Sequence, residues 1–373
     1  MTTKSKRRST DARQGIVDSI LATRVSSRTL PNNNHVKRYL QQYFEDVPYE
    51  DLAGRSEDIM ARIALDHLEF GAERRRGQAL LRIYNATEKT HGYASAFTFI
   101  EMVNDDMPFL VNSVSAAINR RGLAVHITVH PIVSVRRDSK GALTGIATAN
   151  DDEAIRESYI RFAVTRETGE QELRKLHREI SKVLADVRVA VRDWGKMRAA
   201  MRESRDLLDN GPKGADRLLR SESQALLEWL ADDHFTFLGY REYRIVKKGK
   251  RSFLEAIPDT GLGVLSHKSS MHEPVEMTTA MQRMRRSRDW LILTKANSRS
   301  TVHRSAFLDY VGVKIYDEKG NVTGERRFIG LLTSVAYSES PTKIPLLRHK
   351  VQRIFDRAGV TKSGHRGKAL LHL

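Results

Sequence analysis

The sequence predicts an α+β fold, in which an N-terminal helical cap precedes a β-α-β-β-α module and a second mixed, mostly antiparallel α+β domain. Three observations support this prediction. Apolar residues recur with helical spacing over 34–70, the spacing changes to strand alternation at 97–103, and several further strands with turn signals follow residue 221. The chain has 373 residues, enough for two or three folded domains of ordinary size.

The N-terminal part divides into a tail and a helical cap. Residues 1–30 are polar and carry seven basic against two acidic side chains, so we expect a flexible basic tail. Residues 31–79 are predicted to form a helical segment with two amphipathic helices. These helices cover 34–47 and 56–70, and a proline and a glycine follow them directly, as is typical of helix ends.

Residues 80–202 are predicted to form the first α+β module. Its elements, in order, are strand 97–103, helix 108–121, strand 123–135 interrupted by Pro131, strand 158–165 and a long helix that begins at 168. An aspartate just ahead of Pro108 is a helix-start signal, because aspartate caps free amides and proline has none to lose. The β-α-β-β-α order is that of a ferredoxin-like fold. A final strand is not evident, so we expect it to be missing or displaced.

A second α+β domain is predicted over 221–360, after a linker at 203–220 that glycine and proline punctuate. Its elements are a helix at 221–231, strands at 235–245, 253–257, 291–295, 311–316 and 327–333, and a last helix at 343–357. Residues 361–373 end in a mixed apolar run without a helix cap. We expect them to be the truncated start of a further segment.

Composition limits the chemistry of this chain. It contains no cysteine, which excludes disulfides, thiolate metal sites and cysteine nucleophiles. The residue spacing gives no metal-ligand cluster and no catalytic constellation, so we predict neither metal ligands nor catalytic residues. No apolar run has the length of a membrane-spanning helix and no secretory signal is recognised, so we expect a cytoplasmic location and no membrane partner.

The formal net charge of +17 leaves two interpretations open. Residues 241–304 hold 14 basic against six acidic side chains, a surplus that would suit nucleic acid or another polyanion. However, the basic residues are scattered, and no aromatic sheet motif or recognition helix accompanies them. A solvated basic surface, or a face that meets an acidic domain, is therefore favoured over a nucleic-acid partner.

The strongest local candidate for a binding site lies between the strand at 97–103 and the following helix. It places Asn104, Asp105, Asp106 and Asn112 beside the free amides of a helix N-terminus, a geometry that binds small anions such as an amino-acid carboxylate. These four residues are candidate effector-binding residues. The alternative is that Asp105 or Asp106 only caps the helix, because two carboxylates would repel an anion.

A second polar segment covers residues 294–304. Lys295, Asn297, Arg299 and Arg304 lie there among several hydroxyl groups, a composition that suits phosphate or carboxylate binding, or docking against another domain. A solvated loop is the equal alternative.

Two other patterns have simpler explanations. Gly261 and Gly263 superficially resemble a dinucleotide-binding loop, but Ser266 stands in place of the third glycine and no strand precedes them, so we predict a turn. His126 and His130 share one face of a predicted strand, where a spacing of four residues separates them by about 13 Å. That is too far to share a metal ion, and packing roles are predicted.

Five longer strings, spread in order over residues 103–359, resemble a known family. They are VNDDMPFLVNSVSAAINRRGLAVHITVHPI (103–132), LLEWLADDHFTFLGYREY (226–243), LTKANSRSTVHR (293–304), LDYVGVKIYDEKGNVTGERRFIGLLTSVAY (308–337) and IPLLRHKVQRIFDRAG (344–359). These strings are similar to the N-terminal region of the large bacterial NAD-dependent glutamate dehydrogenases.

The resemblance implies that residues 80–202 form an ACT-like module and that 221–360 are PAS-like. In this family such modules form a regulatory half that precedes the catalytic half. Effectors of ACT domains commonly bind near the first strand-to-helix loop, which again points to the segment 104–112. The family's glutamate-binding lysines and its NAD-binding segment have no matching stretch here, so no catalytic or cofactor-binding residue is assigned.

The function that this resemblance implies is regulation and oligomerisation within an enzyme that converts L-glutamate, with NAD, to 2-oxoglutarate and ammonia. The implied partners are an amino-acid effector, the rest of the dehydrogenase chain and further copies of it. The chain alone is expected to be inactive. A stand-alone module that binds an amino acid or nucleic acid through its basic surface is the alternative.

Overall fold

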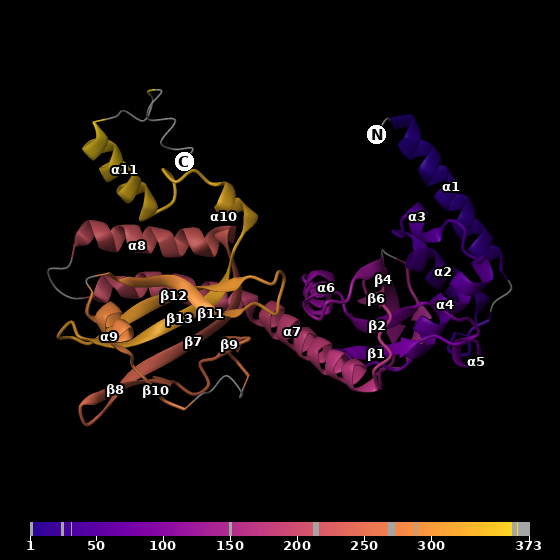
Figure 1. The fold of residues 1–373 in the computed structure, drawn as a ribbon, viewed down its shortest axis with the longest axis horizontal. Coiled ribbons are helices and arrows are strands. Elements are labelled where there is room, and N and C mark those ends of the chain that lie inside the picture. The colour runs from indigo at the N-terminus through magenta and orange to yellow at the C-terminus, as the bar shows by residue number, and fades with distance from the viewer. Residues whose placement is uncertain are drawn as a thin grey trace. The chain divides into compact units, whose positions relative to one another are not determined.

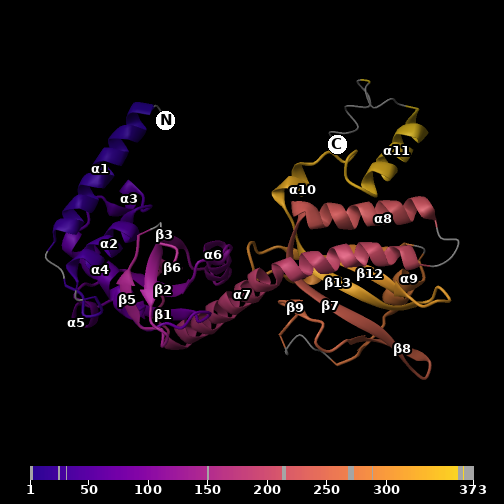
Figure 2. The ribbon, with the colours of Figure 1, turned by 180° about the vertical axis from the view of Figure 1, so that it is seen from behind.

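The computed structural model describes residues 3–23, 26–30, 32–148, 151–211, 216–267, 273–287, 289–359 and 364. The chain divides into two units, Met1–Ala185 and Asp186–Leu373, and each contains helices and an antiparallel sheet (Figures 1 and 2). The predicted α+β class is therefore confirmed. None of the helices in the described residues has the length and apolar character needed to cross a bilayer.

The sheet of the first unit is built around two long strands. Its strands are β1 (Leu80–Asn85), β2 (Phe97–Asp105), β3 (Val125–Val129), β4 (Ile132–Arg137), β5 (Leu143–Ile146) and β6 (Ile155–Thr165). They lie in the order β1-β2-β6-β4-β5, and β3 also pairs with β6. β3 and β4 pair with the same strand on either side of a break that contains Pro131, which has no amide hydrogen to donate. The single strand predicted at 123–135 is therefore present as two pieces.

The predicted β-α-β-β-α order is present as β2, α6 (Leu110–Arg120), β3 with β4, β6 and α7 (Glu170–Leu207). No strand was evident in the sequence after the last helix of this module, and in the structure the earlier strand β1 extends the sheet instead. β1 precedes β2 in the chain and pairs with the edge of β2 that faces away from β6. β1 and β5 were not predicted, and β5 lies between the strands predicted at 123–135 and 158–165.

The described residues of the first unit also form the helices α1 (Thr3–Ala22), α2 (Asn33–Phe44), α3 (Tyr49–Leu52), α4 (Glu57–Phe70) and α5 (Glu88–His91). The prediction of a flexible tail at 1–30 is wrong, because α1 occupies most of that range. Val17 and Ile20 of α1 are buried in the core that also contains residues of α2 and α4. Their neighbours Ile16 and Leu21 complete an i, i+4 stripe in an otherwise polar helix, too short to stand out from the basic composition.

The helices predicted at 34–47 and 56–70 are confirmed as α2 and α4. Asn32 caps α2 by accepting a hydrogen bond from the amide of Asn34, and Gly71 ends α4 as expected. The apolar face of α2 (Val36, Tyr39, Leu40, Tyr43 and Phe44) packs into the same core as the sheet residues Val103, Val133, Val135 and Tyr159. These helices therefore cover one face of the first sheet.

The second unit contains a larger sheet. Its strands are β7 (Phe235–Lys248), β8 (Arg251–Ala256), β9 (Leu262–Gly263), β10 (Val275–Glu276), β11 (Leu291–Arg299), β12 (Phe307–Tyr316) and β13 (Val322–Leu332). Its helical elements after α7 are η1 (Leu208–Asn210), α8 (Arg217–Trp229), η2 (Leu230–His234), α9 (Thr279–Arg286), α10 (Ser334–Ser338) and α11 (Leu347–Ala358). The strand order is β10-β8-β7-β13-β12-β11, with β9 beside β7, and all pairs are antiparallel.

The boundary between the units differs from the linker predicted at 203–220. α7 continues to Leu207, and the division falls within it, at Ala185. The second half of this helix belongs to the second unit because Met197 and Met201 are buried in that unit's core, together with residues of α8, β7, β12 and β13. The turn predicted at Gly261 and Gly263 is not present as such, because Leu262–Gly263 form the short strand β9 beside β7 and the turn follows at 264–265. The amide of Gly263 donates to Asp193 at 2.9 Å. The truncated segment predicted at 361–373 lies outside the described residues except for 364.

Candidate functional site

The predicted effector segment has a different local structure from the one expected. β2 continues through Asp105, and α6 begins only at Leu110. Its N-cap is Phe109, which has a left-handed φ of 75° and makes no side-chain capping bond. The predicted helix start at Pro108 with an aspartate cap is therefore wrong. The reason is that other partners hold both aspartates.

Asp105 belongs to an internal ion-pair network. It accepts hydrogen bonds from Arg74 at 2.7 Å and from the amide of Gly77 at 3.0 Å. Of the two predicted amides, Asn104 is buried and Asn112 is exposed. The four candidate residues therefore lie in different surroundings and do not all face one space.

Asp106 is joined to a histidine that the sequence assigned to packing. The hydroxyl of Ser158 donates to Asp106 at 2.9 Å, and Nε2 of His130 lies 3.0 Å from the same hydroxyl oxygen. Burial lowers the pKa of His130, although Asp106 and Asp46 oppose this shift, so the ring is neutral near neutral pH. This polar chain links the predicted effector segment to the break between β3 and β4.

The first unit also buries charge between its sheet and its helices. Glu157 accepts from Arg74 at 2.6 Å and from Arg137 at 2.6 and 2.7 Å. A second carboxylate, Glu101, pairs with Arg82 and Arg161 at 2.5 and 2.9 Å. The side chains of both glutamates are 0% exposed. Partners among the neighbouring side chains satisfy these groups, so their role is structural.

The predicted docking segment 294–304 is partly a strand, because β11 extends to Arg299. Its cations are held by their own unit. Lys295 pairs with Asp309 at 2.5 Å, Arg299 donates to the carbonyl of Ser305 and lies over Phe307, and Arg304 donates to the carbonyl of Leu332. Lys295 and Asn297 also line a pocket, and this pocket is the most complete candidate site in the second unit.

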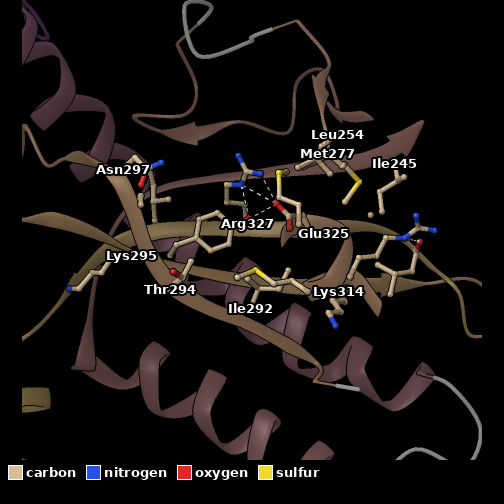
Figure 3. Close-up of a pocket in the computed structure, with 18 of the residues that line it drawn as sticks. Ile245, Leu254, Met277, Ile292, Thr294, Lys295, Asn297, Lys314, Glu325 and Arg327 are labelled. Carbon is tan, nitrogen blue, oxygen red and sulfur yellow. Dashed lines mark hydrogen bonds and ion pairs between the residues drawn. The ribbon is translucent and has the colours of Figure 1, made fainter. Parts of the chain in front are cut away.

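The pocket has a volume of about 420 Å³ and opens on the face of the second sheet opposite α8 (Figure 3). The strand register explains its position. Phe328 lies opposite Val311 and Tyr240 and faces the core, so its neighbours Arg327 and Ile329 point to the other face. A pocket of this volume is at the lower end of the range of ligand sites, about 300–1,000 Å³.

A charged pair lies in the middle of the pocket. Arg327 donates to Oε1 of Glu325 at 2.6 Å, and the hydroxyl of Tyr310 donates to the same oxygen at 2.5 Å. The guanidinium also lies over the rings of Tyr243 and Tyr310, at 3.8 and 5.1 Å from their centroids. Burial and the neighbouring carboxylate of Glu325 raise the pKa of Tyr310, so its phenol remains a hydrogen-bond donor.

Figure 3 shows this pair between Leu254 and Met277 on one side and Ile292 on the other. Met281 and Met284 of α9 add two more apolar side chains to the wall. Arg327, Glu325 and Tyr310 were not predicted from the sequence. The signal that could have found the pair is the strand period of two, which places Glu325 and Arg327 on the same face of a strand. Among the described residues, no three His, Asp or Glu side chains could together hold a metal ion.

Comparison with known proteins supports the resemblance in two ways. Residues 39–180 match the family model of the glutamate dehydrogenase ACT1 domain, and residues 344–373 match that of glutamate dehydrogenase helical motif 1. The chain is 33% identical over 344 residues to the NAD-specific glutamate dehydrogenase of Halomonas elongata, which is 91% of this chain and 21% of the relative.

Two further relatives are also NAD-specific glutamate dehydrogenases. The Pseudomonas aeruginosa protein is 32% identical over 358 residues (95% of this chain, 22% of the relative), and the Mycobacterium tuberculosis protein is 25% identical over 308 residues (82% and 18%). The chain thus spans about a fifth of the length of the curated relatives that it matches. The chain therefore belongs to the large NAD-specific glutamate dehydrogenase family, within which it corresponds to the N-terminal region that carries the ACT1 domain.

Proposed function

We propose that this chain is the regulatory and oligomerisation region of a cytoplasmic NAD-specific glutamate dehydrogenase and does not itself transfer hydride. The observation that carries the proposal is the match of residues 39–180 to the ACT1 domain of that family, in a chain that spans about a fifth of its relatives. In this proposal, NAD binding and the oxidation of L-glutamate to 2-oxoglutarate and ammonia belong to the rest of the dehydrogenase chain.

The mechanism would be thermodynamic linkage. An effector that binds one arrangement of the regulatory modules more tightly than another shifts the equilibrium of the catalytic part by that difference in affinity, and by no more. The segment with Asn104, Asp105, Asp106 and Asn112 remains a proposed effector site for an amino acid. Its two aspartates already have internal partners, so an effector there would have to exchange contacts with Arg74 or Ser158.

A direct assay tests the catalytic part of this proposal. Purified chain 1–373 is mixed with NAD and L-glutamate, and formation of the reduced cofactor is followed by absorbance, with the Pseudomonas aeruginosa relative as a positive control. We expect no signal above the blank from the chain and steady reduction from the control. Turnover by the chain alone would contradict the proposal.

A second candidate function is binding of a polyanion such as nucleic acid. A groove of about 1070 Å³ in the second unit is lined by Lys247, Lys250, Arg251, Arg285 and Arg286. If several of these side chains contacted phosphates, the affinity for an oligonucleotide would fall steeply with added salt. A titration of a labelled oligonucleotide at two salt concentrations separates this function from amino-acid binding, which depends little on salt.

A further inference from the structure

The charged pair in the pocket of the second unit has unused hydrogen-bonding capacity. Arg327 uses Nε and Nη2 to contact Glu325 or Tyr310, and Glu325 accepts all of its bonds at Oε1. Within the part of the chain that the structure describes, Nη1 of Arg327 and Oε2 of Glu325 make no hydrogen bond. Both side chains line the pocket and retain some exposure, 21% for Arg327 and 9% for Glu325.

The charge of this pair limits the ligands that fit. Arg327 and Glu325 neutralise each other, so a lone carboxylate at Nη1 would also meet the negative charge of Glu325. A lone ammonium group at Oε2 would likewise meet the charge of Arg327. A molecule that carries both groups on one carbon pairs each with its opposite and leaves the Arg327–Glu325 pair neutral, which low-dielectric surroundings favour.

Nearby lysines do not alter this balance at the centre. Lys295 pairs with Asp309 and extends away from the pair in Figure 3. Lys314 donates to the backbone carbonyl and the hydroxyl of Ser287, at 2.9 and 3.0 Å. Arg285, which also lines the pocket, donates to the backbone carbonyl of Val322 at 3.3 Å.

The other side chains that line the pocket favour a ligand with an apolar side chain. Leu254, Met277, Met281, Met284 and Ile292 surround the pair, and three of them are methionines. Methionine sulfur makes favourable contacts with aromatic rings, and its flexible side chain adapts to a bulky group. An apolar side chain that enters from the charged centre would be enclosed by these residues.

We propose that this pocket binds an α-amino acid with a large apolar, preferably aromatic, side chain. Its carboxylate contacts Nη1 of Arg327, its ammonium group contacts Oε2 of Glu325, and its side chain packs against the methionines. The inference goes beyond the proposed regulatory function and does not rest on it, because binding can be measured whether or not the chain controls a catalytic partner. It concerns a different site from the segment at 104–112.

Three matched probes test the proposal on the chain of 373 residues by isothermal titration calorimetry. They are L-phenylalanine, hydrocinnamate, which lacks the ammonium group, and phenethylamine, which lacks the carboxylate. We expect L-phenylalanine to bind at least about tenfold more tightly than either analogue, because each analogue leaves one charge of the pair unmatched. Equal or tighter binding of hydrocinnamate or phenethylamine, or no binding of L-phenylalanine, would overturn the proposal.

Two neighbouring variants locate the binding. Thr294 is exposed and lines the pocket, whereas the side chain of the adjacent Leu293 is also exposed and lies on the other face of β11. Thr294→Trp should fill the pocket and abolish binding of L-phenylalanine, and Leu293→Trp should leave it unchanged, with thermal unfolding confirming that both variants fold. Unchanged binding by Thr294→Trp would place the ligand elsewhere and refute the pocket assignment.

Glu325→Gln provides a second, independent variant because it retains the shape of the pocket. We expect it to bind L-phenylalanine and hydrocinnamate with similar affinity, since the carboxylate that attracts the ammonium group and repels a monoanion is gone. A retained preference for L-phenylalanine would show that Glu325 does not contact the ammonium group, and would also overturn the proposal.

Discussion

The two sheets of this protein bury the same kind of charged pair in different surroundings. In the first unit, Glu101 and Glu157 each contact two arginines, and their side chains are 0% exposed. In the second unit, Glu325 contacts one arginine, and the pair faces a pocket of about 420 Å³. An Arg–Glu pair alone therefore does not identify a binding site, and the structure that covers it decides whether it can receive a ligand.

The charged pairs of the two units differ in exposure because different helices pack beside the two sheets. Over the first sheet, α1, α2 and α4 contribute many buried side chains to one core, which includes Leu40, Leu68 and Tyr159. Next to the pocket of the second sheet lies α9, which has eight residues and no buried side chain. A short, arginine-rich helix excludes less water and leaves room beside the pair. We therefore expect the ion pairs of Glu101 and Glu157 to contribute more to the free energy of unfolding than the Arg327–Glu325 pair does.

Glu157→Gln should have the largest effect on stability. It leaves the guanidinium groups of Arg74 and Arg137, whose side chains are 0% and 3% exposed, without their shared carboxylate. Breaking a buried pair in this way costs about 3–5 kcal/mol. The free energy of unfolding is measured by urea denaturation followed by far-UV circular dichroism.

The position of the tryptophans shows which unit is affected. Trp194, Trp229 and Trp290 are the three tryptophans of the chain, and all lie within Asp186–Leu373. Glu157→Gln should therefore shift the dichroism transition without moving the tryptophan fluorescence transition. The exposed Glu153→Gln serves as control and should change neither. A cost below about 1 kcal/mol, the range of exposed pairs, would refute the structural role of the network.

The sequence predicted the elements better than the contacts between them. Strand 97–103 and helices 34–47 and 56–70 were recognised because each has a clear period and a terminating residue. β1 was missed because its residues are half-buried on both faces and show no alternation. The capping role of Asp105 was wrong because Arg74 lies 31 positions away in the sequence, and a pairing over that distance leaves no local signal.

The candidate site shows the same limit. Lys295 and Asn297 were selected from a dense polar segment, and both line the pocket. Arg327 and Glu325 have more central positions, but they are two of many charged residues in a basic sequence. Only the register of β13 against β12, together with the placement of Met277 and α9, brings them into one space. Tertiary pairing of this kind cannot be derived from the periodicity of one strand.

The second prediction concerns acid stability of the first unit. His67 is a buried residue of α4, and its ring nitrogens contact the hydroxyl of Tyr43 and a carbonyl oxygen of β2. Burial lowers the pKa of His67 from 6.5 to about 4, although the carboxylate of Glu101 opposes the shift while Arg82 and Arg161 add to it. The unfolded chain therefore binds a proton at a higher pH than the folded chain. Stability should be full above pH 6.5 and fall as the pH decreases toward 4, by roughly 3 kcal/mol over the whole window.

Urea titrations at a series of pH values, again followed by circular dichroism, measure this loss. In His67→Gln, which preserves a donor and an acceptor but does not titrate, the slope of stability against pH over this window should be smaller. The tryptophan transition of the second unit provides the internal control, because His67 lies outside that unit. An unchanged slope in the variant would mean that another group is responsible for the acid sensitivity.

The smallest effect is expected from Glu325→Gln, and it separates the two sheets most sharply. Arg327 is 21% exposed and lies against the rings of Tyr243 and Tyr310, so water and the two rings still solvate its charge when the carboxylate is removed. We expect a loss of about 1–2 kcal/mol in the tryptophan-detected transition, less than the loss from Glu157→Gln. The exposed Glu318→Gln in the same unit is the control. A loss as large as that from Glu157→Gln would mean that the Arg327–Glu325 pair is as tightly enclosed as the network of Glu157. It would contradict the difference proposed between the buried pairs of the first sheet and the pocket-lining pair of the second.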